Sequence, residues 1–220
     1  MAFGCIFDWD GVIADSSAQH IEAWKLVAEK EHLIFREELF RQSFGMKSEQ
    51  IIPDLFQWTH DNAEVRRLDR KKEKIYRELV IANGTGTFPG VREFLTMLKQ
   101  HGISCIIGSS APRANVTTAL DFLGFSDFFS GIVCGDDVTA GKPDPQIFLK
   151  AAEWLGLYPD ACIVFEDALV GIAAARAGGM KVVAVTTTYP RSQLGDADMV
   201  VDRLNELSLL QLTQLVQKQA

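Results

Sequence analysis

The chain has 220 residues, of which 47% are hydrophobic and 23% charged, and its formal net charge is −7. This length and composition are typical of a globular protein with one large domain or a core and a smaller insert, and they exclude a disordered or fibrous chain. The acidic balance argues against a nucleic-acid or membrane-surface binder, and no apolar run approaches the roughly 20 residues of a membrane span. We therefore expect a cytoplasmic protein, or a mature form already trimmed of a targeting segment, with no nucleic-acid or membrane partner.

The first predicted strand, at residues 3–7, ends in two carboxylates. Asp8 and Asp10 follow this apolar run with one residue between them, and Gly11 allows a sharp turn. We expect the turn to bring Asp10 back over Asp8, so that two like charges need a cation, a shared proton or a hydrogen-bond network to compensate them. Taken alone, Asp10-Gly11 is equally typical of a plain turn.

Residues 16–82 are predicted to be entirely helical. Asp15-Ser16-Ser17 supplies N-cap residues for a first helix, and apolar residues recur three or four apart in the segments 35–44, 49–58 and 63–81. A breaker-rich stretch at 83–90 ends this part. The order predicts a helical cap domain (16–82) inserted after the first strand of a core domain (1–15 and 83–220), where it can cover the two acids and open and close over them.

Strands and helices alternate from residue 91 to the end. The predicted strands are 103–108, 131–134, 162–165, 181–185 and 199–201, and the predicted helices are 91–98, 115–123, 145–155, 169–177 and 204–216. This alternation predicts a doubly wound, mostly parallel α/β sheet with helices on both faces. The four cysteines lie in or beside apolar runs without a CxxC pair, which favours buried reduced thiols over disulfides or a zinc site.

Four sets of polar residues follow predicted strands, whose carboxyl ends form the ligand-binding edge of such a sheet. Hydroxyls at a helix N-terminus suit an anion, a lysine held before a proline can neutralise a phosphoryl group, and acids supply the hard oxygen ligands that Mg²⁺ prefers. Each set alone is typical of a cap or of surface charge, whereas four in order indicate one site. They are Asp8 with Asp10, Ser109 with Ser110, Lys142 before Pro143, and Glu166 with Asp167.

These sets resemble the four motifs of the haloacid dehalogenase (HAD) superfamily of aspartate-dependent phosphohydrolases, and the helical insert resembles the cap of its β-phosphoglucomutase-like branch. The resemblance covers the whole chain. It implies an HAD-like Rossmannoid core and a Mg²⁺-dependent phosphatase that hydrolyses a small phosphorylated metabolite, such as a sugar phosphate, through an aspartyl-phosphate. One alternative is a β-phosphoglucomutase-type sugar phosphomutase. Another, from a different class, is a signalling protein in which Asp8 is phosphorylated and the aspartyl-phosphate is hydrolysed slowly.

The resemblance also implies residue roles. Asp8 is the expected nucleophile, and Asp10 the general acid and then base, with its backbone carbonyl on the metal. Ser109 is expected to hold phosphoryl oxygens, and Lys142 to steady Asp8 and the transferring group. The expected Mg²⁺ ligands are Asp8, Asp10, Glu166 and Asp167.

The cap contributes the remaining expected contacts. His20 is placed to reach the catalytic acid, and Lys72 matches a lysine that contacts substrate in the branch; both are also typical of structural or exposed helix residues. Sugar mutases carry an arginine at the position of Ser48 to hold a second phosphate, and the adjacent Lys47 replaces a bidentate arginine poorly, which favours hydrolysis. The segment from Gly45 to Pro53 is also similar to plant-type phosphatases of a flavin precursor. The expected substrate-binding residues are His20, Lys47, Lys72 and Ser110. We expect the protein to be a monomer.

Overall fold

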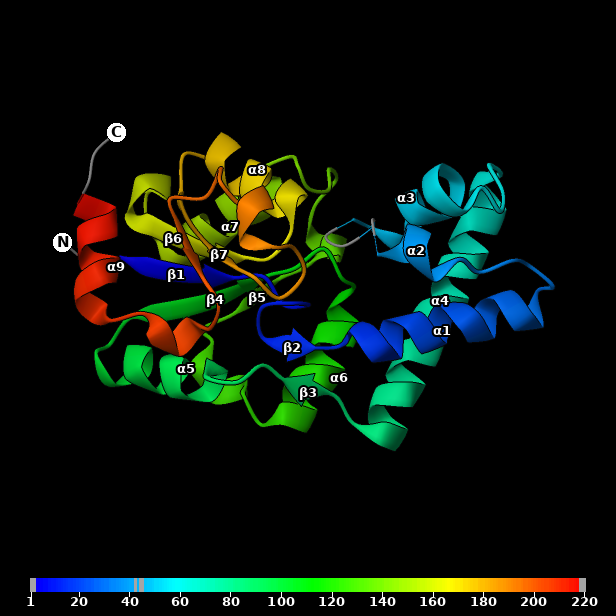
Figure 1. The fold of residues 1–220 in the computed structure, drawn as a ribbon, viewed down its shortest axis with the longest axis horizontal. Helices are drawn as coiled ribbons and strands as arrows, with labels where there is room; N and C mark the ends of the chain where they lie inside the picture. Colours follow the sequence, from blue (N-terminus) through cyan, green and yellow to red (C-terminus); the bar gives the residue numbers. More distant parts are fainter. Residues whose placement is uncertain (1–2, 42, 44–45, 218–220) are drawn as a thin grey trace.

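The computed structural model describes residues 3–41, 43 and 46–217. Six parallel strands form one sheet in the order β5-β4-β1-β6-β7-β8, which confirms the predicted α/β class (Figure 1). The strands are β1 (Gly4–Phe7), β4 (Ser104–Gly108), β5 (Ile132–Val133), β6 (Cys162–Glu166), β7 (Lys181–Val185) and β8 (Met199–Val201).

Strand β1 lies in the middle of the sheet. Cys5 pairs with Cys105 of β4 on one side and with Ile163 of β6 on the other. The chain therefore builds the sheet from β1 outward to β5, then returns and builds it outward to β8. Ligands bind at the carboxyl end of the strands where the order reverses in this way, so the end of β1 is the expected site.

Side chains of β1 alternate between two hydrophobic clusters, one on each face of the sheet. Ile6 belongs to the cluster covered by α7 (Gln146–Leu155) and α8 (Leu169–Ala177). Phe7 belongs to the other cluster, which also receives the buried side chains of α5 (Val91–Gln100), α6 (Arg113–Leu123) and α9 (Leu209–Gln217). The C-terminal helix thus packs on its own core. All four cysteines are buried and free, as predicted.

Four further helices lie together to one side of the sheet (Figure 1). They are α1 (Ser17–Lys30), α2 (Glu37–Phe40), α3 (Ser48–Ile51) and α4 (Asn62–Asn83), and a π-helical turn, η1 (Ile52–Phe56), continues α3. The long helices α1 and α4 pack against each other, burying Trp24 and Tyr76. We call α1–α4 the cap helices; the division of the chain into two domains stays a prediction.

Several elements differ from their predicted bounds. Helix α2 covers only four residues of the segment 35–44, of which 42 and 44 lie outside the described residues. The predicted helix 49–58 is divided between α3 and η1, because Pro53 at the start of η1 has no N–H for the α-helical ladder. Helix α9 begins at Leu209 instead of Leu204, because a 3₁₀ turn and the extended Leu207 precede it.

Two short strands join the cap helices to the sheet. β2 (Ala14–Asp15) pairs antiparallel with β3 (Gly86–Thr87), so the outgoing and returning chains are hydrogen-bonded to each other beside β1. Sequence periodicity cannot predict strands of two residues. Among the described residues, no helix is long and apolar enough to cross a membrane.

Candidate active site

The turn after β1 gives its two aspartates different surroundings. The amide of Asp8 still donates to the Phe165 carbonyl of β6 at 3.0 Å, so Asp8 stays in the line of the sheet. Gly11 then adopts φ +90°, and a Cβ on it would lie 2.0 Å from Asp167 Oδ2. Only glycine allows the turn to pass so close to Asp167, which follows β6. The side chain of Asp8 is 7% exposed, whereas that of Asp10 is 25% exposed and lies on the side of the cap helices.

Lys142 lies between two buried carboxylates. Its Nζ is 2.6 Å from Asp8 Oδ1 and 2.6 Å from Glu166 Oε1, and the ring of Phe148 lies 4.8 Å below it. Burial alone would lower the pKa of Lys142, but the two facing carboxylates outweigh burial and raise it. The ammonium is therefore charged, and it fixes Asp8 in one orientation.

Asp8, Glu166 and Asp167 form a buried acidic group. One carboxylate oxygen from each lies within 4.8 Å of the others. Glu166 is held in place because its Oε2 accepts hydrogen bonds from the amides of Asp167 and Ala168, both at 2.9 Å. Gly171 leaves room for this carboxylate, since a Cβ there would lie 1.7 Å from Glu166 Oε1.

The electrostatics of this acidic group fit a divalent cation. Burial raises the pKa of Asp8 to about 7, against the opposing effect of Lys142. Burial, together with the charges of Glu166 and Asp8, raises the pKa of Asp167 well above its usual value. A cation offsets such repulsion, and three carboxylates supply the oxygen ligands that hard divalent cations such as Mg²⁺ require.

Asp10 takes its partners from the cap side. Its Oδ1 accepts a hydrogen bond from Ser16 Oγ at 2.5 Å and lies 3.3 Å from His20 Nε2. Although burial favours the neutral acid, the hydrogen bonds from His20 and Ser16 outweigh it and hold the pKa of Asp10 below its usual value. His20 Nδ1 lies 2.9 Å from Lys72 Nζ, which can only donate, so Nε2 carries the ring proton that faces Asp10. The Asp10 carbonyl as a metal ligand stays a prediction.

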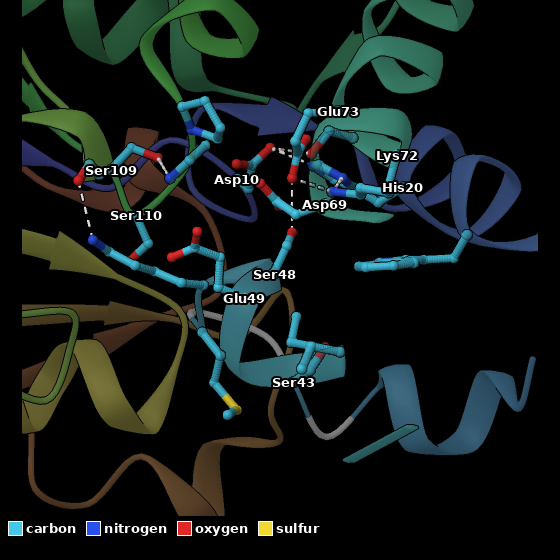
Figure 2. Close-up of a pocket in the computed structure, with 18 of the residues that line it drawn as sticks. Asp10, His20, Ser43, Ser48, Glu49, Asp69, Lys72, Glu73, Ser109 and Ser110 are labelled. Carbon is cyan, nitrogen blue, oxygen red and sulfur yellow. Dashed lines mark hydrogen bonds and ion pairs between the residues drawn. The ribbon is translucent and has the colours of Figure 1, made fainter. Parts of the chain in front are cut away.

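Ser109 and Ser110 lie between the end of β4 and the start of α6. Ser109 is buried, and its Oγ accepts from the amide of Ala111 at 3.1 Å. Helix α6 begins at Arg113 after Pro112, which has no N–H to leave unsatisfied. Both serines line the cavity that separates this loop from the cap helices (Figure 2).

The cavity has a volume of about 200 Å³. It brings together seven predicted residues: Asp8, Asp10, Ser109 and Ser110 on the core side, and His20, Lys47 and Lys72 on the cap side. Lys142, Glu166 and Asp167 are not among its lining residues; they lie behind Asp8. The wall also contains Glu49, Asp69 and Glu73 of the cap helices, which the sequence did not single out.

Lys47 makes an unexpected contact. Its Nζ donates to the main-chain carbonyls of Gly135, at 3.0 Å, and Val138, at 3.5 Å, so it connects the start of α3 to the loop after β5. Its role in binding substrate stays a prediction.

Two threonines after β7 were also missed. Thr188 Oγ1 donates to Asp167 Oδ2, and Thr187 Oγ1 donates to the Gly11 carbonyl at 2.5 Å. The available signal was Thr186-Thr187-Thr188 directly after a predicted strand, at the same edge as the other four sets.

Comparisons with known proteins agree with this geometry. Residues 4–179 match the family model of the haloacid dehalogenase-like hydrolases. The chain is 38% identical to the chloroplastic 5-amino-6-(5-phospho-D-ribitylamino)uracil phosphatase of Arabidopsis thaliana, over 96% of this chain and 57% of that protein. It is 34% identical to the β-phosphoglucomutase of Bacillus subtilis, over 93% of this chain and 91% of that protein. A crystal structure of β-phosphoglucomutase from Clostridium difficile has a TM-score of 0.86 at 28% identity, covering 99% and 98% of the two chains.

The chain therefore belongs to the haloacid dehalogenase-like hydrolase family, an enzyme family that generally uses a divalent metal. The chain spans just over half the length of the Arabidopsis phosphatase and most of the length of the Bacillus mutase.

Proposed function

We propose that this enzyme is a Mg²⁺-dependent phosphatase that releases inorganic phosphate from a small phosphorylated metabolite. The observation that carries the proposal is that two aspartates lining one cavity have different surroundings. Asp8 is buried and fixed by Lys142, as a nucleophile requires. Asp10 is more exposed and hydrogen-bonded to Ser16 and His20, as a group that gives and takes a proton requires.

The reaction has two steps. First, an oxygen of Asp8 attacks phosphorus, the bond from phosphorus to the ester oxygen breaks, and Asp10 gives a proton to that oxygen. Second, a water molecule attacks the aspartyl-phosphate, Asp10 takes a proton from the water, and the bond from Asp8 to phosphorus breaks to release phosphate. The substrate phosphate brings negative charge close to Asp10, and this favours the protonated form that the first step needs.

Other residues bind and orient the phosphoryl group. Ser109 and Ser110 offer hydroxyls to its oxygens, and Lys142 keeps Asp8 aligned. A Mg²⁺ ion would be held by Asp8, Glu166 and Asp167, with the carbonyl of Asp10 as a further ligand, and supplies positive charge that offsets the repulsion between carboxylate and phosphate.

The cap side of the cavity favours hydrolysis over a mutase reaction. A sugar mutase must hold both phosphates of a bisphosphate, which calls for a cation at the far end of the cavity. The described lining residues include no arginine. Ser48 donates its hydroxyl proton to Glu73, and the Lys47 ammonium is bonded to carbonyls.

The finer assignments are also proposals. The name of the Arabidopsis relative specifies a phosphorylated ribityl compound, and a sugar or polyol phosphate suits the polar cavity here. The monomeric state and the cytoplasmic location stay predictions.

The test is phosphate release from a panel of phosphomonoesters, with Mg²⁺ and then with a chelator, including glucose 1-phosphate with its bisphosphate activator. We expect Mg²⁺-dependent release that Asp8→Asn reduces by roughly 10³-fold or more without changing the circular dichroism spectrum. Asp15→Asn, at an exposed residue outside the cavity, is the matched control. Isomerisation without release would identify a mutase, and a phospho-enzyme that never releases phosphate would identify a signalling protein.

A further inference from the structure

One side of helix α4 forms an acidic wall of the cavity. Asp69, Lys72 and Glu73 are three and four residues apart, so they share one side of the helix, and all three line the cavity. Glu49 of α3 lines it too, and Figure 2 shows its carboxylate directed into the space between the cap helices and the loop of Ser109 and Ser110. When Asp8 attacks the phosphorus of a bound phosphomonoester, the leaving group of that ester occupies this space.

Both lysines among the described residues that line the cavity already have partners. Lys72 Nζ lies 2.9 Å from His20 Nδ1 and 2.9 Å from Glu73 Oε1. Lys47 Nζ is bonded to two carbonyls of the loop after β5. Neither ammonium is therefore directed at an incoming anion.

Glu73 is also fully engaged, but the other two acids are not. Glu73 accepts hydrogen bonds from Ser48 at 2.7 Å and from Asn115 at 2.5 Å. The side chains of Glu49 and Asp69 have no hydrogen bond or ion pair with any described residue. Glu49 is exposed and Asp69 is half-buried, so their carboxylates are acceptors without protein donors that line a cavity of about 200 Å³.

Asp69 is the more affected of the two by its surroundings. Burial, followed by the charge of Glu73, raises its pKa to about 7. Both effects disfavour more negative charge at this place, and a hydroxyl or ammonium donor relieves both.

We propose that Glu49 and Asp69 determine specificity by selecting phosphomonoesters whose leaving group carries hydroxyl or amino donors and no second anion. The inference rests on the proposed phosphatase function and deepens it. The substrate class is a polyhydroxy or amino alcohol esterified to a single phosphate, and sugar bisphosphates and phosphorylated acids are rejected by repulsion from this wall.

The test compares three six-carbon ligands that differ in charge: glucosamine 6-phosphate, glucose 6-phosphate and 6-phosphogluconate. Each competes with p-nitrophenyl phosphate in a Mg²⁺-dependent hydrolysis assay, so its inhibition constant reports binding whether or not it is hydrolysed. We expect 6-phosphogluconate to bind at least about tenfold more weakly than glucose 6-phosphate, because its carboxylate meets like charges. Glucosamine 6-phosphate should bind at least as well as glucose 6-phosphate.

Variants then identify the residues responsible. Glu49→Gln and Asp69→Asn should each bring the ratio of the two inhibition constants closer to one, and Glu78→Gln, an exposed change on the same helix outside the cavity, should leave it unchanged. Equal inhibition constants for the two ligands in the wild type, or a ratio that neither variant changes, would overturn the inference. The proposed phosphatase function would still stand in that case, because p-nitrophenyl phosphate is hydrolysed. Absence of that hydrolysis with Mg²⁺ overturns the phosphatase and the inference with it.

Discussion

Thr188 shows how a residue outside the four predicted sets acts on the acidic group. Its hydroxyl donates to Asp167 Oδ2 and so fixes how that carboxylate presents its oxygens. Partners of this kind tune metal ligands, and their loss typically lowers metal affinity 10- to 100-fold. We expect Thr188→Val to weaken Mn²⁺ or Mg²⁺ binding by roughly tenfold, measured by calorimetry on the substrate-free protein.

Two further variants control this prediction. Thr188→Ser keeps the hydroxyl and should keep the affinity. Thr186→Val removes the neighbouring hydroxyl, which donates to the exposed Asp202 at 2.8 Å, and should have no effect. Equal metal affinity in Thr188→Val and the wild type would contradict the role given to this contact.

The raised pKa of Asp69 predicts that the stability of the protein depends on pH. Its pKa in the folded protein is about 7, above the value of about 3.9 in an unfolded chain, so the folded state binds more protons between these values. The contribution of Asp69 to stability is therefore greatest below pH 4 and declines as the pH rises to about 7. Asp69→Asn keeps the neutral form, so its free energy of unfolding in urea should exceed that of the wild type by more at pH 8 than at pH 5. A difference that does not grow with pH would contradict this linkage.

The residues that sequence analysis could and could not predict differ in one physical respect. Asp8 and Ser109 directly follow strands and Glu166 is the last residue of one, and the parallel sheet brings strand ends together whatever the loops do. The partners of Lys47 depend on a loop 88 residues further along the chain, whose path no local pattern describes. A long side chain can reach several partners, and packing of the cap helices against the core decides among them.

At the scale of elements, α4 and α6 are joined by a buried polar contact. Asn115 of α6 is 1% exposed, donates to Glu73 at 2.5 Å and accepts from Arg77 at 2.9 Å, both on α4. Truncating a buried hydrogen bond to a charged group removes about 1.5–3 kcal/mol of stability. We expect Asn115→Ala to lower the free energy of unfolding by that amount in urea titrations.

Thr118→Ala, on the same helix, is the matched control for this contact. The Thr118 hydroxyl is exposed and, among the described residues, bonds only to the Ala114 carbonyl of its own helix. Its loss should change stability by less than about 0.5 kcal/mol. Similar losses in the two variants would show that the contact between α4 and α6 adds nothing beyond helix propensity.

The predicted bounds were most accurate where a run of similar residues ends at a clear breaker. Helix α8 and strand β7 match their predicted bounds because a run of alanines and a run of valines each fit one period and end at glycine or threonine. The pair β2–β3 exists because the chain enters and leaves the cap helices at adjacent points, which only the tertiary fold determines. The connection between the two parts of the chain was therefore the least predictable feature.

At the scale of the whole molecule, the sheet concentrates unfavourable charge at one edge. Lys142 is the cation that contacts Asp8 and Glu166, and Asp167 lies beside them, where burial disfavours its charged form. The folded protein holds these acids together and the unfolded chain does not. A divalent metal therefore binds the folded state preferentially and stabilises the whole fold.

Thermal unfolding with and without Mg²⁺ measures this stabilisation. At a hundredfold excess over its dissociation constant, a ligand adds about 2.7 kcal/mol, which for a chain of this length raises Tm by roughly 5–10 °C. Asp167→Asn should have two opposite effects at pH 8. It removes a buried charge and so should raise the Tm of the metal-free protein, and it removes a ligand and so should abolish most of the Mg²⁺ shift. Glu22→Gln, at an exposed residue of α1, should change neither, and a full Mg²⁺ shift in Asp167→Asn would place the metal elsewhere.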